Sequence, residues 1–108
     1  MARLCVAFDV DGTLWCGLPP GPVTAEWFRA LCRTPDTGVV VVSGSPNRPR
    51  PVEGWAEINQ DPDRQRNLEA AGRIVEADVR LYVSDNEGDD ARAASAGFVF
   101  VRPENFRL

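Results

Sequence analysis

The chain has 108 residues and a net charge of −4, and all twelve of its basic residues are arginines, because it contains neither lysine nor histidine. This length fits a single domain, 1–108, and the acidic balance argues against a general nucleic-acid binder, although it does not exclude a local basic patch. The missing residues exclude an imidazole base, a histidine-bound metal, Schiff-base chemistry and a lysine clamp for phosphate.

The first half of the chain predicts two buried strands and one helix. Leu4–Phe8 and Val39–Val42 are continuous apolar runs, the pattern of strands that are covered on both faces of a sheet. Between them, Thr24 is a suitable N-cap for a helix that runs to about Arg33. The segment Asn47–Pro51 holds two prolines and two arginines, so we expect an exposed loop there.

The second half continues the alternation of strands and helices. Trp55–Ile58 predicts a short strand, and Asp61 followed by Pro62 predicts the start of a helix. The apolar stripe of that helix consists of Leu68, Ala71 and Val75. A strand is then expected at Leu81–Val83 and a helix at Asp89–Ala96, which ends at Gly97. The last strand is expected at Phe98–Val101. This order indicates an α/β fold, a three-layer, Rossmann-like open parallel sheet of about five strands.

Acidic and hydroxyl side chains follow three of the predicted strands. Asp9 and Asp11 come after the first strand, Ser43 after the second, and Asp85 after Leu81–Val83. In an open parallel sheet the reactive groups collect beyond the carboxyl ends of the strands. We therefore expect these side chains to meet at one edge of the sheet, and this convergence is the main functional signal in the sequence.

The same segments resemble motifs of the haloacid dehalogenase (HAD) superfamily. Phe8–Leu14 is similar to motif one, Asp-x-Asp-Gly-Thr after a buried strand. Val39–Ser43 resembles motif two, a hydrophobic strand that ends in Ser or Thr. Tyr82–Asp90 resembles motif four, an acid at a strand end followed four or five residues later by another. The resemblance covers nearly the whole chain and implies a HAD-like core.

The chain departs from the family pattern at motif three. A lysine, less often an arginine, neutralises the nucleophile and the phosphate there, and the nearest matches in this chain are Arg64 and Arg66. We expect Arg64 to be the clamp, with Arg66 the lesser candidate, because the arginine fork can hold both a carboxylate and a phosphate.

The resemblance implies a phosphatase that hydrolyses phosphomonoesters through an aspartyl-phosphate. Asp9 matches the nucleophile, and Asp11 would protonate the leaving oxygen and then deprotonate the attacking water. Ser43 would donate a hydrogen bond to a phosphate oxygen.

A Mg²⁺ ion is implied as the cofactor, because a carboxylate that attacks a phosphate dianion meets strong repulsion. The expected ligands are Asp9, the backbone carbonyl of Asp11, and Asp85, since Mg²⁺ prefers oxygen donors. Asp89 or Asp90 would orient a metal-bound water or Asp85 without binding the metal directly.

Simpler interpretations and two other functions stay open. Acids and serines at strand ends can form turns, acids at a helix start can complement its dipole, and arginines on a helix are commonly solvated. One other function is a nucleic-acid end-processing phosphatase, because Arg48 and Arg50 follow motif two and can hold a polyanion. The other is a binding or regulatory module that has lost turnover together with the lysine.

The sequence predicts a HAD-like core without a cap domain. Only about ten residues separate Leu14 from the helix start expected near Ala25, whereas an independent cap needs on the order of 50 residues. The site should then stay open unless the substrate or a partner subunit excludes water. We therefore expect the phosphate to be carried by a bulky or macromolecular substrate.

The composition also predicts the cellular compartment of the chain. No apolar run approaches the roughly 20 residues of a membrane span. The three cysteines lack metal-ligand spacing, so reduced thiols in the cytoplasm are expected. The sequence leaves the oligomeric state open.

Overall fold

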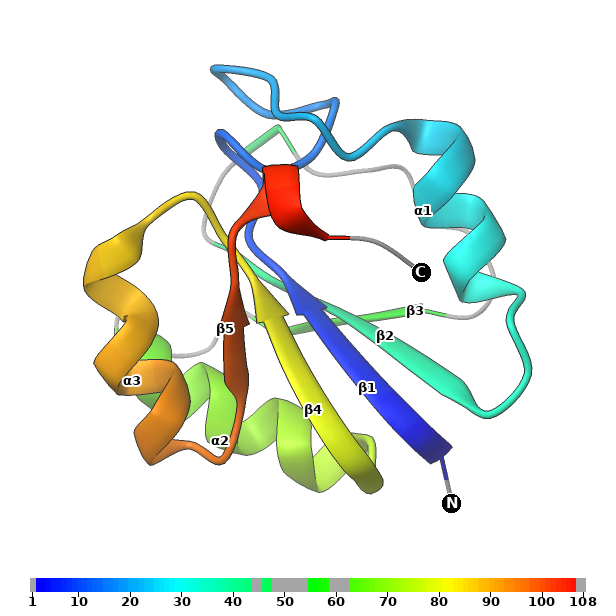
Figure 1. Cartoon of the computed structure of the whole chain (residues 1–108), viewed down its shortest axis with the longest axis vertical. Coiled ribbons are helices and arrows are strands. Elements are labelled where there is room, and N and C mark those ends of the chain that lie inside the picture. Colours follow the sequence, from blue (N-terminus) through cyan, green and yellow to red (C-terminus); the bar gives the residue numbers. More distant parts are fainter. Residues whose placement is uncertain (1, 44–45, 48–54, 59–62, 107–108) are drawn as a thin grey trace.

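The computed structural model describes residues 2–43, 46–47, 55–58 and 63–106, which form an α/β fold around one parallel sheet. Its strands are β1 (Ala2–Phe8), β2 (Thr37–Val42), β3 (Trp55–Ile58), β4 (Ala77–Val83) and β5 (Val99–Val101). Its helices are α1 (Ala25–Cys32), α2 (Arg64–Ile74) and α3 (Asp90–Ser95). The strand order is β3-β2-β1-β4-β5 (Figure 1), so the predicted parallel sheet with alternating strands and helices is confirmed.

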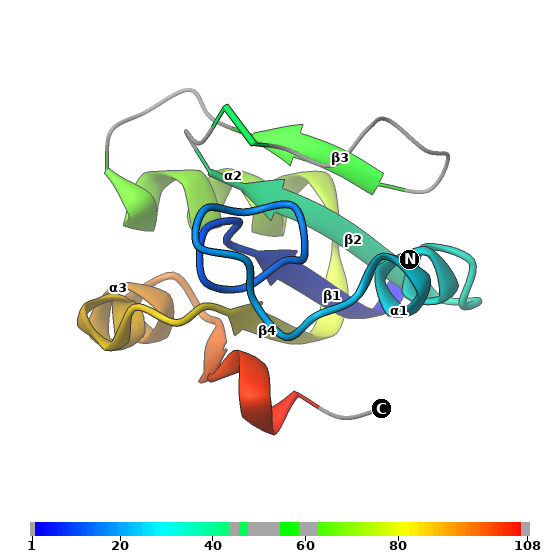
Figure 2. The same ribbon diagram turned by 90° about the horizontal axis from the view of Figure 1, so that it is seen from above.

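Two apolar clusters cover opposite faces of the sheet. In β1, Val6 and Phe8 belong to the cluster that contains side chains of α1. Cys5 and Ala7 belong to the other cluster, which contains side chains of α2 and α3. All four are fully buried, because successive side chains of a strand point to opposite faces and both faces are covered. Helices on two sides of the sheet are visible in Figure 2.

The strand order places a topological switch point between β1 and β4. From β1 the chain continues through α1 to β2 and β3 on one side, and it then returns to β4 on the other side of β1. The helices that follow β1 and β4 lie on opposite faces of the sheet, because α1 packs in one cluster and α3 in the other. Ligands of open α/β sheets bind beyond the carboxyl ends of the strands at such a point. The loops after β1 and β4, which lie together in Figure 1, therefore flank the expected crevice.

Helix α2 differs from its prediction at both ends. Its N-cap is Asp63, whose carboxylate accepts a hydrogen bond from the backbone N–H of Gln65 at 2.9 Å. The predicted start, Asp61-Pro62, lies outside the described residues. Val75, predicted on the helical stripe, is an extended residue after the last turn, although it packs against the same cluster as Leu68 and Ala71. That shared burial is the reason why its spacing resembles a helical repeat.

The other boundaries shift by a few residues. Strands β1, β2 and β4 begin earlier than predicted, because their first residues pair with neighbouring strands although some are polar or exposed. A 3₁₀ turn at Glu87–Asp89 precedes α3, and Gly97 has a φ of +84°, which fits the predicted glycine stop. The short 3₁₀ turn Pro103–Asn105 was not predicted. No helix in the described residues is long and apolar enough to cross a membrane.

Candidate active site

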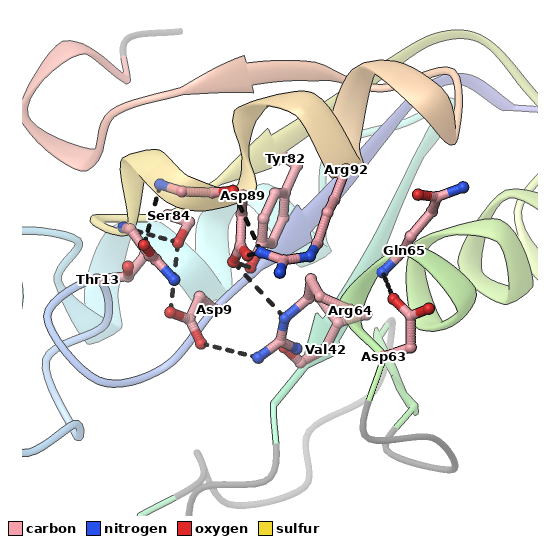
Figure 3. A network of polar contacts seen from close by, with 12 residues as sticks. Asp9, Thr13, Val42, Asp63, Arg64, Gln65, Tyr82, Ser84, Asp89 and Arg92 are labelled. Atoms are coloured by element: carbon pink, nitrogen blue, oxygen red, sulfur yellow. Dashed lines mark hydrogen bonds and ion pairs between the residues drawn. The ribbon is translucent and has the colours of Figure 1, made fainter.

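Asp9 lies directly after β1, at the carboxyl end of the central strand. Its backbone N–H donates to the carbonyl of Val83 at 3.0 Å, so the contact between β1 and β4 continues to this residue. The side chain is 15% exposed, and the Ser84 hydroxyl donates to its Oδ2 at 3.3 Å. Figure 3 shows the carboxylate between Ser84 on one side and Arg64 on the other. Ser84, directly after β4, and Arg64, at the start of α2, therefore orient this carboxylate.

The environment of Asp9 disfavours its charge. Burial raises the pKa of Asp9 above 3.8, and the negative charge of Asp85 raises it further. The Arg64 guanidinium, a backbone N–H of Val10 and the Ser84 hydroxyl lower this pKa, but burial outweighs them. The ionised carboxylate is thus only partly compensated by the protein itself.

Arg64, the first residue of α2, connects three separate segments of the site. Its Nη2 lies 3.7 Å from Oδ1 of Asp9, and its Nε lies 3.9 Å from Oδ2 of Asp89. Its Nη1 donates to the carbonyl of Val42, the last residue of β2. The structure therefore brings Arg64, not the exposed Arg66, to the candidate nucleophile.

Asp89 is a buried carboxylate held by a hydroxyl and two guanidinium groups. Only 6% of its side chain is exposed. The Tyr82 hydroxyl donates to Oδ2 at 3.2 Å, and Nη1 of Arg92 donates to Oδ1 at 3.0 Å. Burial raises the pKa of Tyr82 far above its usual range, so the hydroxyl keeps its proton and remains a donor. Asp90 is exposed in the first turn of α3, so of the two predicted supports only Asp89 joins the network around Arg64.

Asp85 follows β4 and packs on the loop that carries Asp9. Its backbone N–H donates to Oγ1 of the buried Thr13 at 3.2 Å. At Gly12, whose φ is +76°, a Cβ would overlap the Asp85 carboxylate. The backbone conformation therefore favours glycine here, and a Cβ would push the exposed Asp85 carboxylate out of its place.

Asp11 and Ser43 lie at the same edge of the sheet. The backbone N–H of Leu18 donates to Oδ1 of Asp11 at 2.9 Å, which ties this carboxylate to the following loop. Ser43 is buried and comes directly after Val42, the residue whose carbonyl Arg64 contacts. Arg48 and Arg50, the predicted polyanion contacts, lie outside the described residues.

An open cleft of about 410 Å³ lies beside this network. Its lining residues come from α2, the loop after β4 and α3: Asp63, Arg64, Asn86, Asp89 and Arg92. Arg64 both lines the cleft and approaches Asp9 (Figure 3), so the cleft adjoins the candidate nucleophile.

Several residues of the network were not predicted. Ser84 follows a strand, so the strand-end rule that selected Ser43 also applies to it. Thr13 was part of the motif after β1, but no role was assigned to it. Tyr82 and Arg92 become functional candidates only through their contacts with Asp89, which sequence spacing does not reveal.

The surroundings of the cysteines disfavour them as an alternative nucleophile. Burial raises the pKa of Cys5 to about 11 and also raises the pKa of Cys16 and of Cys32 above 9.0. Attack by a thiol requires the thiolate, which these shifts disfavour at neutral pH.

The donors near Asp9 fit Mg²⁺ in their chemistry. In the described part of the chain, no three His, Cys, Asp or Glu side chains form a group that can hold a metal. The predicted set differs from such a group, because Asp9 and Asp85 would supply carboxylates and Asp11 its backbone carbonyl. Mg²⁺ commonly completes its shell with water, and the space above Gly12 admits the Asp85 carboxylate. The oxygens of Asp89 already have partners, which fits a supporting role and not direct coordination.

Comparison of the chain with models of known protein families, with curated proteins and with solved structures finds no match. The resemblance to the HAD superfamily therefore stays a prediction.

Replacement of Asp9 by Asn should stabilise the protein at neutral pH. The raised pKa means that the folded protein favours the protonated Asp9 carboxyl. The contribution of this carboxyl to stability is therefore fully present below pH 3.8 and is lost as the pH rises through the folded-state pKa. The asparagine side chain stays neutral at every pH, so it avoids this loss of stability. We expect a higher free energy of unfolding for Asp9→Asn at neutral pH, and a difference that disappears below pH 3.8, measured by urea denaturation.

The control is Asp78→Asn, which removes a carboxylate from an exposed position of β4. It should give no comparable gain at neutral pH. A loss of stability in Asp9→Asn at neutral pH would contradict this prediction. It would show that the interactions of the Asp9 carboxylate with Arg64 and Ser84 stabilise the protein more than the burial of its charge destabilises it.

Proposed function

We propose that this chain is a Mg²⁺-dependent phosphomonoesterase with a HAD-like core and no cap domain, and that Asp9 is its nucleophile. The observation that carries the proposal is the position of Asp9 between Arg64 and Ser84, with Asp85 nearby, at the carboxyl ends of two adjacent parallel strands. This arrangement supplies a carboxylate to attack phosphorus and a cation to receive the phosphate.

The two oxygens of Asp9 have different surroundings. Ser84 donates to Oδ2 at hydrogen-bonding distance, whereas Arg64 approaches Oδ1 only to 3.7 Å. Ser84 thus fixes the carboxylate, and Oδ1 is the oxygen that would attack phosphorus while the alcohol leaves. Arg64 is placed to pair with the incoming phosphate, because its fork binds phosphate oxygens well.

Asp11 is the proposed general acid and base. In the first step it would protonate the leaving oxygen, and in the second it would take a proton from the water that hydrolyses the aspartyl-phosphate. The hydrogen bond from Leu18 to its Oδ1 limits the rotation of the carboxylate. Ser43 would donate to a phosphate oxygen from the end of β2.

When bound, Mg²⁺ would compensate the charges of the attacking carboxylate and the phosphate. Asp9, Asp85 and the backbone carbonyl of Asp11 are the residues that would hold it. Mg²⁺ prefers oxygen ligands of this kind. A bound cation would also reduce the repulsion between the carboxylates of Asp9 and Asp85.

The open surroundings of the site support a large substrate. Residues 9–24 form a loop, and a bridge between Leu14 and Val23 closes part of it against itself. No separate domain is formed between β1 and α1, and Asp85 is exposed. The site therefore suits a phosphate carried by a bulky or macromolecular group.

Hydrolysis of p-nitrophenyl phosphate with and without Mg²⁺ tests the proposal. We expect phosphate release that requires Mg²⁺, a loss of more than tenfold in Asp9→Asn, and a weaker apparent affinity for Mg²⁺ in Asp85→Asn. A loss of roughly 10²- to 10⁴-fold is expected for Asp11→Asn, the usual contribution of a general acid and base.

The same titrations distinguish the rival functions. Activity that is indifferent to a chelator would reject the metal assignment, and more than a tenth of the activity in Asp9→Asn would reject the nucleophile. Binding of phosphate compounds without any turnover would favour a regulatory module.

Comparison of Arg64→Ala with Arg66→Ala tests the clamp. Arg64→Ala should raise KM and lower kcat strongly, because it removes the cation beside Asp9, whereas Arg66→Ala removes an exposed charge on the same helix and should have little effect. Circular dichroism would verify that both variants are folded. Equal, small effects would mean that neither arginine is the clamp.

A further inference from the structure

Arg92 is the second arginine of the cleft beside Asp9, and no step proposed above uses it. It lies on α3, its side chain is 52% exposed, and it lines the cleft together with Arg64. Its two hydrogen bonds, to Asp89 and to the carbonyl of Gly88, both come from Nη1. Within the part of the chain that the structure describes, Nε and Nη2 have no hydrogen-bond partner. One edge of the guanidinium is thus fixed and the other can receive a ligand.

Asn86 contributes a second donor to the same cleft. Its Oδ1 accepts from the backbone N–H of Gly88 at 3.0 Å, and this bond determines which end of the amide is oxygen. Its Nδ2 has no partner among the described residues. Arg92 and Asn86 therefore both offer N–H groups to whatever occupies the cleft.

The carboxylates of the cleft have partners other than Asn86 Nδ2 and the Nε and Nη2 of Arg92. Asp89 is held by Tyr82 and the two arginines, and Asp63 caps the first turn of α2 through the N–H of Gln65. An incoming anion would meet unused donors at Arg92 and Asn86. The arginine fork and an amide match the oxygens of a phosphate.

We propose that Arg92 and Asn86 bind a second phosphate of the substrate, next to the phosphate that Asp9 attacks. This inference rests on the proposed function, because it names the substrate class of the same site. Asp89 separates the guanidinium of Arg64 from that of Arg92, so the two phosphates would bind to neighbouring arginines of one cleft. The shared chemistry is that of a nucleoside bisphosphate or of a phosphorylated nucleic-acid end, in which a second phosphate lies close to the terminal one.

The ratio of kcat/KM for a nucleoside 3′,5′-bisphosphate to that for the 5′-monophosphate tests the inference in the full chain. The wild type should prefer the bisphosphate, and Arg92→Gln should lower the ratio roughly 10- to 100-fold, the usual effect of losing hydrogen bonds to a charged group. Asn86→Asp keeps the acceptor for Gly88 but replaces the amide donor by a charge, so it should also lower the ratio. A 5′-phosphorylated oligonucleotide, run in parallel, separates the small source of the second phosphate from the macromolecular one.

Arg29→Gln is the matched control, because Arg29 is exposed on α1, on the opposite face of the sheet. Its ratio should equal that of the wild type. An equal loss for both substrates in Arg92→Gln would mean that Arg92 acts only through Asp89, and the inference would be wrong. A wild-type ratio near one would overturn it as well.

A binding measurement separates this inference from the proposed function. If p-nitrophenyl phosphate is not hydrolysed either, the proposed function fails, and calorimetry with the two nucleotides decides on the second phosphate. Tighter binding of the bisphosphate that Arg92→Gln abolishes would support the inference. Equal affinities for the two compounds would overturn it.

Discussion

The site depends on one cation, the guanidinium of Arg64, between two carboxylates from different segments. Asp9 and Asp89 are both largely buried, and Arg64 approaches each to within 4 Å while it also contacts the end of β2. Removal of Arg64 would leave both carboxylates without this cation, and an uncompensated charge in the protein interior costs about 3–5 kcal/mol. Arg64 is 22% exposed, so solvent reduces this cost, but it does not remove it. The ends of β1 and β2, the start of α2 and the buried acid before α3 are thus coupled through one side chain.

The sheet determines which residues can meet around that cation. Because β1 and β4 are neighbours, the residues that follow them lie side by side: Asp9 with Ser84, and Gly12 with Asp85. Burial on both faces holds the strands in place, while the loops beyond their carboxyl ends carry the polar groups. The pKa of Asp9 remains raised despite Arg64, which indicates that the protein alone does not fully compensate its charge. A site of this kind favours the binding of a further cation, and this is the physical basis of the proposed Mg²⁺ requirement.

The sequence predicted the strands and the edge where the site lies, because both depend on local patterns. Continuous apolar runs such as Val39–Val42 are direct signs of buried strands, and the acids that follow such strands must lie at one edge of a parallel sheet. The start of α2 was misplaced because Asp61 and Asp63 are equally suitable caps in sequence. The bonds from Tyr82 and Arg92 to Asp89 could not be predicted, because they depend on the packing of α3 against the sheet.

Identification of a phosphorylated residue during turnover is the most direct test of the central claim that Asp9 is the nucleophile. The protein would be mixed with p-nitrophenyl phosphate and Mg²⁺, quenched rapidly in acid, digested and mapped by mass spectrometry. We expect one phosphoryl group on the peptide that contains Asp9, absent without substrate and absent in Asp9→Asn. Steady turnover with a phosphoryl group on another residue, or with no phosphorylated peptide at any quench time, would contradict it.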